Sequence, residues 1–202
     1  MKAATLPGLM LGFIGLACGS LGAQPLPLPL SDAATQTLTW VKGQRAQTGR
    51  PFLLLDKRLA HAWVFDSNAQ MVGSTPVLLG AATGDESVPG IGEKPIASIL
   101  PHERTTPAGR FHMEPGKNAK GERIYWVDYG AAVSLHRVRA ANVKERRLER
   151  LATHDPGDNR ISYGCINVPE AFYNDVIDGQ FASGQGSIYI LPEMRPLSTL
   201  LK

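Results

Sequence analysis

The most informative stretch of the sequence is RISYGCINVP, residues 160–169. It follows a strong turn signal, DPGD at residues 155–158, and leads into a helical pattern opened by Pro169. Cys165 thus lies between a turn and a helix, where consecutive backbone N–H groups can converge on one point. A thiolate there is favoured by the nearby helix N-terminus and can attack a carbonyl carbon, while the N–H groups hold the developing oxyanion. Spacing alone fits a buried structural cysteine equally well.

The first 23 residues are typical of a secretory signal peptide. Lys2 gives a positive start, residues 9–16 form a short apolar core, and LGA at residues 21–23 fits a cleavage site. The apolar run is too short and too interrupted by glycine to span a bilayer. Lipid anchoring through Cys18 is the alternative, because LACGS at residues 16–20 is close to a bacterial lipoprotein box.

Either form of processing removes or acylates Cys18 and leaves Cys165 as the single thiol of the domain. A disulfide within the chain is then excluded. An unpaired thiol is a chemical liability in an oxidising compartment unless it is buried or needed. The cysteine count therefore favours a chemical role for Cys165.

The composition indicates one β-dominated globular domain. The chain has 202 residues, of which 43% are hydrophobic and 19% charged, with 21 glycines and 15 prolines. We expect a signal peptide at 1–23, a proline-rich linker with a short helix at 24–50, a catalytic domain at 51–192 and a C-terminal tail at 193–202.

Hydrophobic patterning predicts several strands and few helices. The expected strands are residues 52–55, 59–65, 72–79, 124–127, 131–135 and 187–191. The expected helices are residues 33–46, the charged run 144–151, and a helix that Pro169 opens and Gly179 stops. Residues 84–110 read as a long loop, and long loops in compact domains are often functional.

Neither nucleic acid nor a metal fits the sequence. The net charge is only +3 and the charges are dispersed, apart from the run at 144–151, which reads as a solvated helix face. The histidines are scattered, and no acidic pair accompanies them at ligand spacing. We therefore expect no cofactor.

A cysteine nucleophile needs a partner to accept its proton, and histidine is the usual choice. The five histidines are His61, His102, His112, His136 and His154. His136 directly follows an expected strand, which is a rigid place to hold a base. Spacing alone leaves the choice open, with His136 the leading candidate.

Three segments resemble the L,D-transpeptidase family. SYGCIN, residues 162–167, is similar to the signature Ser/Thr-His-Gly-Cys followed by a hydrophobic residue and Asn or Arg. TPAGRF, residues 106–111, resembles the family's Thr-Pro-x-Gly-x-Phe, and SLH, residues 134–136, resembles the strand that delivers the catalytic histidine. The order of the segments also agrees, and the resemblance spans residues 52–191.

The resemblance implies a β-sandwich catalytic domain with a few short helices. It implies Cys165 as the nucleophile, His136 as the base, and an oxyanion hole built from the backbone N–H groups of Tyr163, Gly164 and Cys165. The implied substrates are peptidoglycan stem peptides, cleaved through a Cys165 thioester. The acyl acceptor would be the amine of a second stem or an outer-membrane lipoprotein, in the periplasm or cell envelope.

Four further residues are candidates for support or substrate contact: Ser134, Ser162, Arg160 and Asn167. Two alternative functions stay open. One is a hydrolase, an L,D-carboxypeptidase that uses water as acceptor, and the other is an inactive domain that binds cell-wall peptides.

The sequence departs from the family pattern at three places. Tyr163 replaces the histidine two positions before the cysteine, and Arg137 follows His136 where Gly, Ser or Thr is usual. The histidine tautomer must then be fixed by another group, such as Ser134 or a backbone carbonyl. The segment between His136 and Ser162 is also longer than usual, and we expect it to form a lid or an acceptor-specific wall.

Overall fold

The computed structural model describes residue 1 and residues 28–44 and 49–202. The predicted signal peptide and the alternative anchor Cys18 lie outside these ranges. Within them, no helix is both long and apolar enough to cross a membrane.

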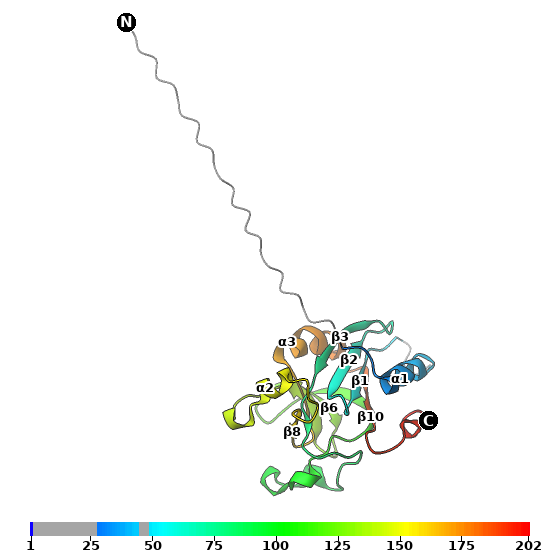
Figure 1. Ribbon diagram of the computed structural model, residues 1–202, viewed down its shortest axis with the longest axis vertical. Helices are drawn as coiled ribbons and strands as arrows, with labels where there is room; N and C mark the ends of the chain where they lie inside the picture. Colours follow the sequence, from blue (N-terminus) through cyan, green and yellow to red (C-terminus); the bar gives the residue numbers. More distant parts are fainter. Residues whose placement is uncertain (2–27, 45–48) are drawn as a thin grey trace.

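A large mixed sheet of eight strands forms the body of the domain (Figure 1). In spatial order its strands are β3 (Met71–Pro76), β2 (His61–Phe65), β1 (Phe52–Asp56), β10 (Gly186–Leu191), β5 (Gly109–Lys117), β6 (Arg123–Asp128), β7 (Val133–Arg137) and β9 (Ile166–Val168). The pairs β1–β10 and β7–β9 are parallel, and the other neighbours are antiparallel. The predicted mainly β class is confirmed.

The sheet nearly closes on itself. Leu78, just after edge strand β3, exchanges two backbone hydrogen bonds of 2.9 Å with Asn167 on the opposite edge strand β9. The next residues form a small parallel sheet from β4 (Leu79–Gly80) and β8 (Arg160–Ser162). This contact brings the segment before Cys165 beside the start of the long loop that carries Thr106.

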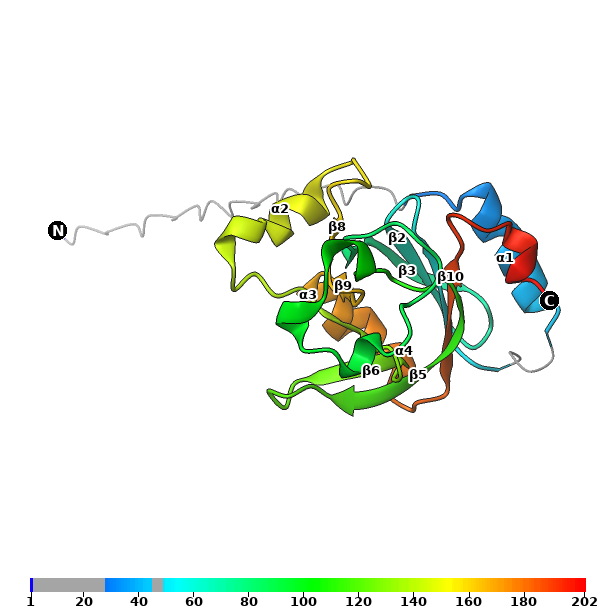
Figure 2. The ribbon, with the colours of Figure 1, turned by 90° about the horizontal axis from the view of Figure 1, so that it is seen from below.

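Short helices surround the sheet. They are α1 (Asp32–Lys42), η2 (Ile91–Glu93), η3 (Ile96–Ser98), η4 (Pro101–Glu103), η5 (Val143–Glu145), α2 (Arg147–Ala152), α3 (Glu170–Phe172), the π-helical η6 (Tyr173–Ile177), α4 (Asp178–Phe181) and η7 (Leu197–Thr199). The helix α1 lies on one face of the sheet, and the run from α3 to α4 lies on the other (Figures 1 and 2).

The continuous apolar run of β1 follows from burial on both faces. Leu53 and Leu55 join the core that includes the helical residues Tyr173 to Phe181. Phe52 and Leu54 join a second core beneath α1. Burial of apolar surface contributes about 25 cal/mol per Å², so both cores stabilise this strand, which lies next to the centre of the sheet.

Several expected boundaries differ from the structure. Strand β5 extends from Gly109 to Lys117, a segment for which the sequence predicts no strand. The prediction fails because only Met113 of the nine residues is buried and the usual alternation of buried and exposed residues is lost. The charged run 144–151 is divided at Arg146, whose φ of +50° is left-handed, so η5 and α2 are separate. The helix α1 ends at Lys42 rather than residue 46, and Gly179 lies inside α4 rather than ending the helix.

Candidate active site

Cys165 lies immediately before edge strand β9 and is partly buried. Its Sγ atom lies 3.6 Å from Ser134 Oγ on the neighbouring strand β7. The thiol also donates a long hydrogen bond of 3.6 Å to the backbone oxygen of Ala132. The structure therefore brings two of the predicted site residues, Cys165 and Ser134, into contact.

The loop before Cys165 needs glycine at position 164. Gly164 has a φ of +124°, and a Cβ atom there would lie 2.9 Å from the backbone oxygen of Thr105. Ser162 tightens the same loop, because its Oγ accepts a hydrogen bond of 3.1 Å from the Gly164 N–H and donates one of 2.6 Å to the Cys165 carbonyl. Ser162 thus supports the backbone around the thiol.

Thr106 connects this loop to the body of the domain. Its buried hydroxyl accepts a hydrogen bond of 2.9 Å from the Gly80 N–H and donates one of 2.8 Å to the Gly164 carbonyl. The Thr-Pro segment of the sequence is therefore a structural support for the cysteine loop.

His136 lies on β7 opposite Asn167 on β9, in the parallel register that also pairs Leu135 with Ile166. His136 Nδ1 lies 2.7 Å from the backbone oxygen of Arg137, and His136 Nε2 lies 3.1 Å from Asn167 Nδ2. The amide oxygen of Asn167 accepts a hydrogen bond of 2.5 Å from Arg147 Nη1 on α2. The group that contacts Nδ1 of His136 is thus the backbone carbonyl of Arg137, the residue that directly follows the histidine.

The imidazole of His136 is held neutral by its surroundings. Burial lowers the pKa of His136 below its ordinary value of 6.5, and the positive charges of Arg139 and Arg147 lower it further. The hydrogen bond to the Arg137 carbonyl and the charge of Glu122 act in the opposite direction but do not outweigh these effects. A neutral imidazole is the form that can accept a proton.

Within the described residues, no hydrogen bond joins Cys165 to His136. Ser134 and His136 are two positions apart on β7, so both side chains project from the same face. The thiol lies beside Ser134, and the ring of His136 lies two positions further along the same strand. Catalytic contacts are often long in structures without substrate and shorten when it binds.

The backbone N–H groups expected to form an oxyanion hole are not equally available. The Gly164 N–H already donates to Ser162 Oγ. Outside the strand ladders, the N–H groups of Tyr163 and Cys165 make no hydrogen bond to another described residue. These two N–H groups are therefore the better candidates for holding an oxyanion.

Tyr163 has a partner that the sequence does not indicate. The guanidinium carbon of Arg104 lies 4.0 Å from the centre of the Tyr163 ring, a distance typical of a cation–π interaction. Arg104 is itself held by hydrogen bonds of 3.3 and 3.0 Å from Nε and Nη2 to the Ile99 carbonyl. The long loop is thereby connected to the residue that replaces the usual histidine.

Arg160 lies in a buried ion cluster, and no contact joins it to Cys165. It pairs with Glu193, and its Nη2 donates a hydrogen bond of 2.9 Å to the backbone oxygen of Lys57. Lys57 Nζ in turn pairs with Asp85 at 2.9 Å and donates to the Thr106 carbonyl at 3.0 Å. Arg160 thus belongs to the ion cluster whose Lys57 contacts the Thr106 carbonyl.

The ionised state of Asp85 is strongly favoured in this cluster. Burial alone would raise the pKa of Asp85. Hydrogen bonds from Lys57 and from the N–H groups of residues 193–195 outweigh burial and hold the pKa well below its ordinary value. Asp85 is therefore held as a carboxylate within this cluster.

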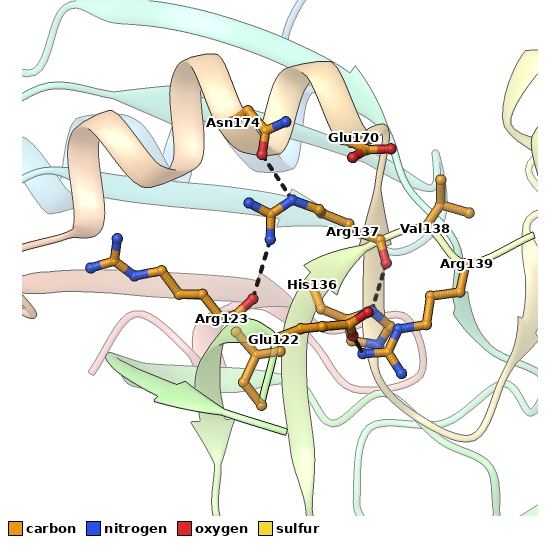
Figure 3. Close-up of a pocket in the computed structure, with 9 residues that line it drawn as sticks. Glu122, Arg123, His136, Arg137, Val138, Arg139, Glu170 and Asn174 are labelled. Carbon is orange, nitrogen blue, oxygen red and sulfur yellow. Dashed lines mark hydrogen bonds and ion pairs between the residues drawn. The ribbon is translucent and has the colours of Figure 1, made fainter. Parts of the chain in front are cut away.

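A pocket of about 480 Å³ opens beside His136 on the side of the α3 helix. Figure 3 shows Arg137 crossing this pocket, with hydrogen bonds to Asn174 at 2.8 Å and to the Arg123 carbonyl at 3.4 Å. Arg139 pairs with Glu122 across its rim. The pocket is thus lined by charges of both signs and leaves His136 accessible.

The other histidines lie apart from the cysteine. His61 is buried on β2, whereas His102, His112 and His154 are exposed. No cluster of three or more metal-ligating side chains occurs in residues 28–44 and 49–202. Sequence reasoning missed Arg104 and Arg147, because nothing in the local pattern pairs either residue with the cysteine motif.

No protein-family model and no curated protein matches the chain. Solved structures do resemble it. The catalytic domain of an L,D-transpeptidase from E. faecium has 17% identity and a TM-score of 0.37, with 71% of this chain and 98% of that domain covered. An L,D-transpeptidase from Mycobacterium smegmatis has 15% identity and a TM-score of 0.40, with 70% and 58% covered.

The helical cell shape determining protein Pgp2 from Campylobacter jejuni has 11% identity and a TM-score of 0.45. The alignment covers 78% of this chain and 55% of Pgp2, so the chain spans little more than half of that protein. Because every one of these TM-scores is below 0.5, the similarities decide neither the activity of this chain nor its catalytic residues.

Proposed function

We propose that this chain is a cysteine acyltransferase of the L,D-transpeptidase type, acting on peptidoglycan stem peptides through a Cys165 thioester. The observation that carries the proposal is that Cys165, immediately before β9, lies 3.6 Å from Ser134 on β7, the strand that also carries His136 and pairs in parallel with β9. A nucleophile and a base on rigid neighbouring strands are what acyl transfer requires.

The chemistry would proceed in two steps. In the first, Cys165 Sγ attacks the carbonyl carbon of the third stem residue, and the thiol proton passes to His136. The C–N bond then breaks, and D-alanine leaves with that proton on its amine. In the second step, the amine of an acceptor attacks the thioester, its surplus proton passes through His136, and the thiol is restored.

The proton path requires a small rearrangement. In the structure, His136 Nε2 is occupied by the Asn167 amide, and the Cys165 thiol points to Ser134 and Ala132. Direct transfer needs a rotation of the Cys165 side chain toward Nε2 and displacement of the Asn167 amide from that atom. Ser134, at 3.6 Å from Sγ, supports the thiol until that rotation occurs.

We place this activity in the periplasm or cell envelope, where peptidoglycan lies and where the signal-peptide pattern would direct the chain. The acceptor is the amine of a second stem or of an outer-membrane lipoprotein. Tyr163 and Gly164 belong to the proposed oxyanion loop, and Asn167 orients His136.

The decisive experiment incubates the purified protein with tetrapeptide muropeptides and identifies the products by mass spectrometry. Cross-linked dimers with free D-alanine support transpeptidation, whereas tripeptides alone identify a carboxypeptidase. Cys165→Ser should abolish both products while leaving the fold intact, since serine lacks an accessible anionic form at neutral pH. Unchanged muropeptides with the wild-type protein would point to a binding domain.

The base is tested in the same assay. His136→Ala should lower turnover by at least 100-fold, the usual scale of general-base catalysis. His102→Ala is the matched control, because His102 is an exposed histidine on η4. If the control loses as much turnover as His136→Ala while staying folded, the assignment of the base is wrong.

A further inference from the structure

We infer that Arg147 is a positioning residue that acts through Asn167 to fix the proton of His136 on Nδ1. Through this contact, the inserted helix α2 controls the state of the base. The inference rests on the proposed function only for the role of His136 in catalysis.

The direction of each hydrogen bond between Arg147, Asn167 and His136 follows from the chemistry of the groups. A guanidinium only donates, so the atom of Asn167 that faces Arg147 is its acceptor Oδ1, at 2.5 Å. The other end of the amide, Nδ2, only donates, and it lies 3.1 Å from His136 Nε2. Nε2 must therefore accept and carry no proton.

The second nitrogen of His136 completes the argument. Nδ1 lies 2.7 Å from the Arg137 carbonyl oxygen, which only accepts. Nδ1 must then hold the proton and donate it. The hydrogen bonds thus run from Arg147 through Asn167 and His136 to the Arg137 carbonyl, and every donor meets an acceptor. Only one neutral tautomer of His136 satisfies all of these contacts.

Asn167 alone could not impose this state. Its side chain is fully buried, and rotating the amide by a half turn would exchange oxygen and nitrogen with little change of shape. With oxygen facing Nε2, the amide would accept a hydrogen bond from an Nε2–H group. Because Nδ1 still donates to the Arg137 carbonyl, this would favour the imidazolium, in which both ring nitrogens donate. The charge of Arg147 is what selects between the two orientations.

Arg147 is itself held firmly on α2. Its side chain is only 13% exposed, and its Nε pairs with Glu145 at 2.5 Å. Arg150 attaches the same helix to the turn before β8 by a hydrogen bond of 2.8 Å to the Asp158 carbonyl, and Leu151 is buried beneath the helix. The charged run therefore contains one arginine that faces the active site.

Other charges also surround His136, and they come from several elements. Arg139 follows β7, Glu122 precedes β6, and Glu170 on α3 lines the same pocket. Arg139 and Glu122 pair with each other and act on the ring in opposite directions, since Arg139 lowers the pKa of His136 and Glu122 raises it. Arg147 is the residue that reaches the ring through an oriented amide.

The test is a nitrogen and carbon NMR titration of the His136 ring in the full-length protein, with the signal assigned by its loss in His136→Gln. The wild-type ring should be the neutral Nδ1–H tautomer at pH 7. In Arg147→Met, the Asn167 amide can turn its oxygen to Nε2, so Nε2 should carry a proton up to a higher pH and the pKa of His136 should rise. Arg147→Lys should restore most of the wild-type state, because lysine also only donates.

Arg146→Met is the matched control. Arg146 lies on the neighbouring position, is 68% exposed and pairs with Glu149, so its loss removes the same charge without touching Asn167. An equal rise of the His136 pKa in Arg146→Met and Arg147→Met would overturn the inference, since only the net charge would then matter. A wild-type ring that is already Nε2–H would overturn it without any variant.

These measurements need no substrate. A protein that shows the expected tautomer but leaves muropeptides unchanged contradicts the proposed function and supports the inference about Arg147. An active enzyme with identical ring states in wild type and Arg147→Met contradicts the inference alone.

Discussion

Thr106 Oγ1 donates a hydrogen bond of 2.8 Å to the carbonyl oxygen of Gly164, 58 positions further along the chain. The same hydroxyl accepts from the Gly80 N–H, so one buried side chain satisfies backbone groups of strand β4 and of the loop before Cys165. The backbone next to the nucleophile is therefore held by the long loop, not only by its own turn.

Removing the Thr106 hydroxyl should weaken both the fold and the proposed activity. Thr106→Val keeps the shape but leaves the Gly80 N–H and the Gly164 carbonyl without this partner, and each unsatisfied buried group costs about 1–3 kcal/mol. We expect unfolding in urea at lower concentration and a turnover at least tenfold lower. Thr39→Val on the exposed face of α1 is the control and should change stability by less than about 0.5 kcal/mol.

The hydroxyl of Tyr163 should be dispensable. The contact with Arg104 uses the face of the ring, which phenylalanine retains. Tyr163→Phe should therefore keep most of the turnover on muropeptides. Tyr163→Ala removes the ring, releases Arg104, and should raise KM more than it lowers kcat.

The opposite result for Tyr163 would be informative. If Tyr163→Phe loses turnover as completely as Cys165→Ser, the phenol takes part in the chemistry. The division of roles between Tyr163 and His136 would then be wrong.

His61 should make the stability of the fold depend on pH. Burial lowers the pKa of His61 from 6.5 to about 4, and the charge of Asp56 opposes this only in part. Because the folded state resists protonation, its stability is complete above about pH 6.5 and falls as the pH drops from 6.5 towards 4. At about 1.4 kcal/mol per pKa unit, the loss is about 3 kcal/mol.

Thermal unfolding measured between pH 7 and pH 4 tests this expectation. His61→Phe should flatten most of the slope, and at pH 7 it should cost little, because His61 Nε2 is buried without a hydrogen-bond partner. A smaller slope should remain, since the pKa of His136 is lowered as well. His154→Gln, at an exposed site, should leave the slope unchanged.

The sequence by itself predicts the mainly β class, which the structure confirms, and a nucleophilic role for Cys165, which stays a prediction. Apolar runs such as residues 52–55 and 187–191 predict buried strands, because side-chain periodicity is a local property. Ser162 is also local, since its hydroxyl contacts backbone groups within three residues of itself, whereas Gly164 is required in part by the distant Thr105 carbonyl. Strand β5 escaped prediction because its residues are mostly exposed.

Only the tertiary structure decided which distant residues meet at the site. The parallel pairing of β7 with β9 places His136 opposite Asn167, and the position of α2 then brings Arg147 to the same amide. Arg104 reaches Tyr163 in the same way, from a loop 59 positions earlier. Such contacts depend on strand order and loop path, and no local pattern of residues encodes them. Asn167 belongs to the cysteine motif, but its contact with His136 depends on the pairing of β7 with β9, and its contact with Arg147 depends on where the fold places α2.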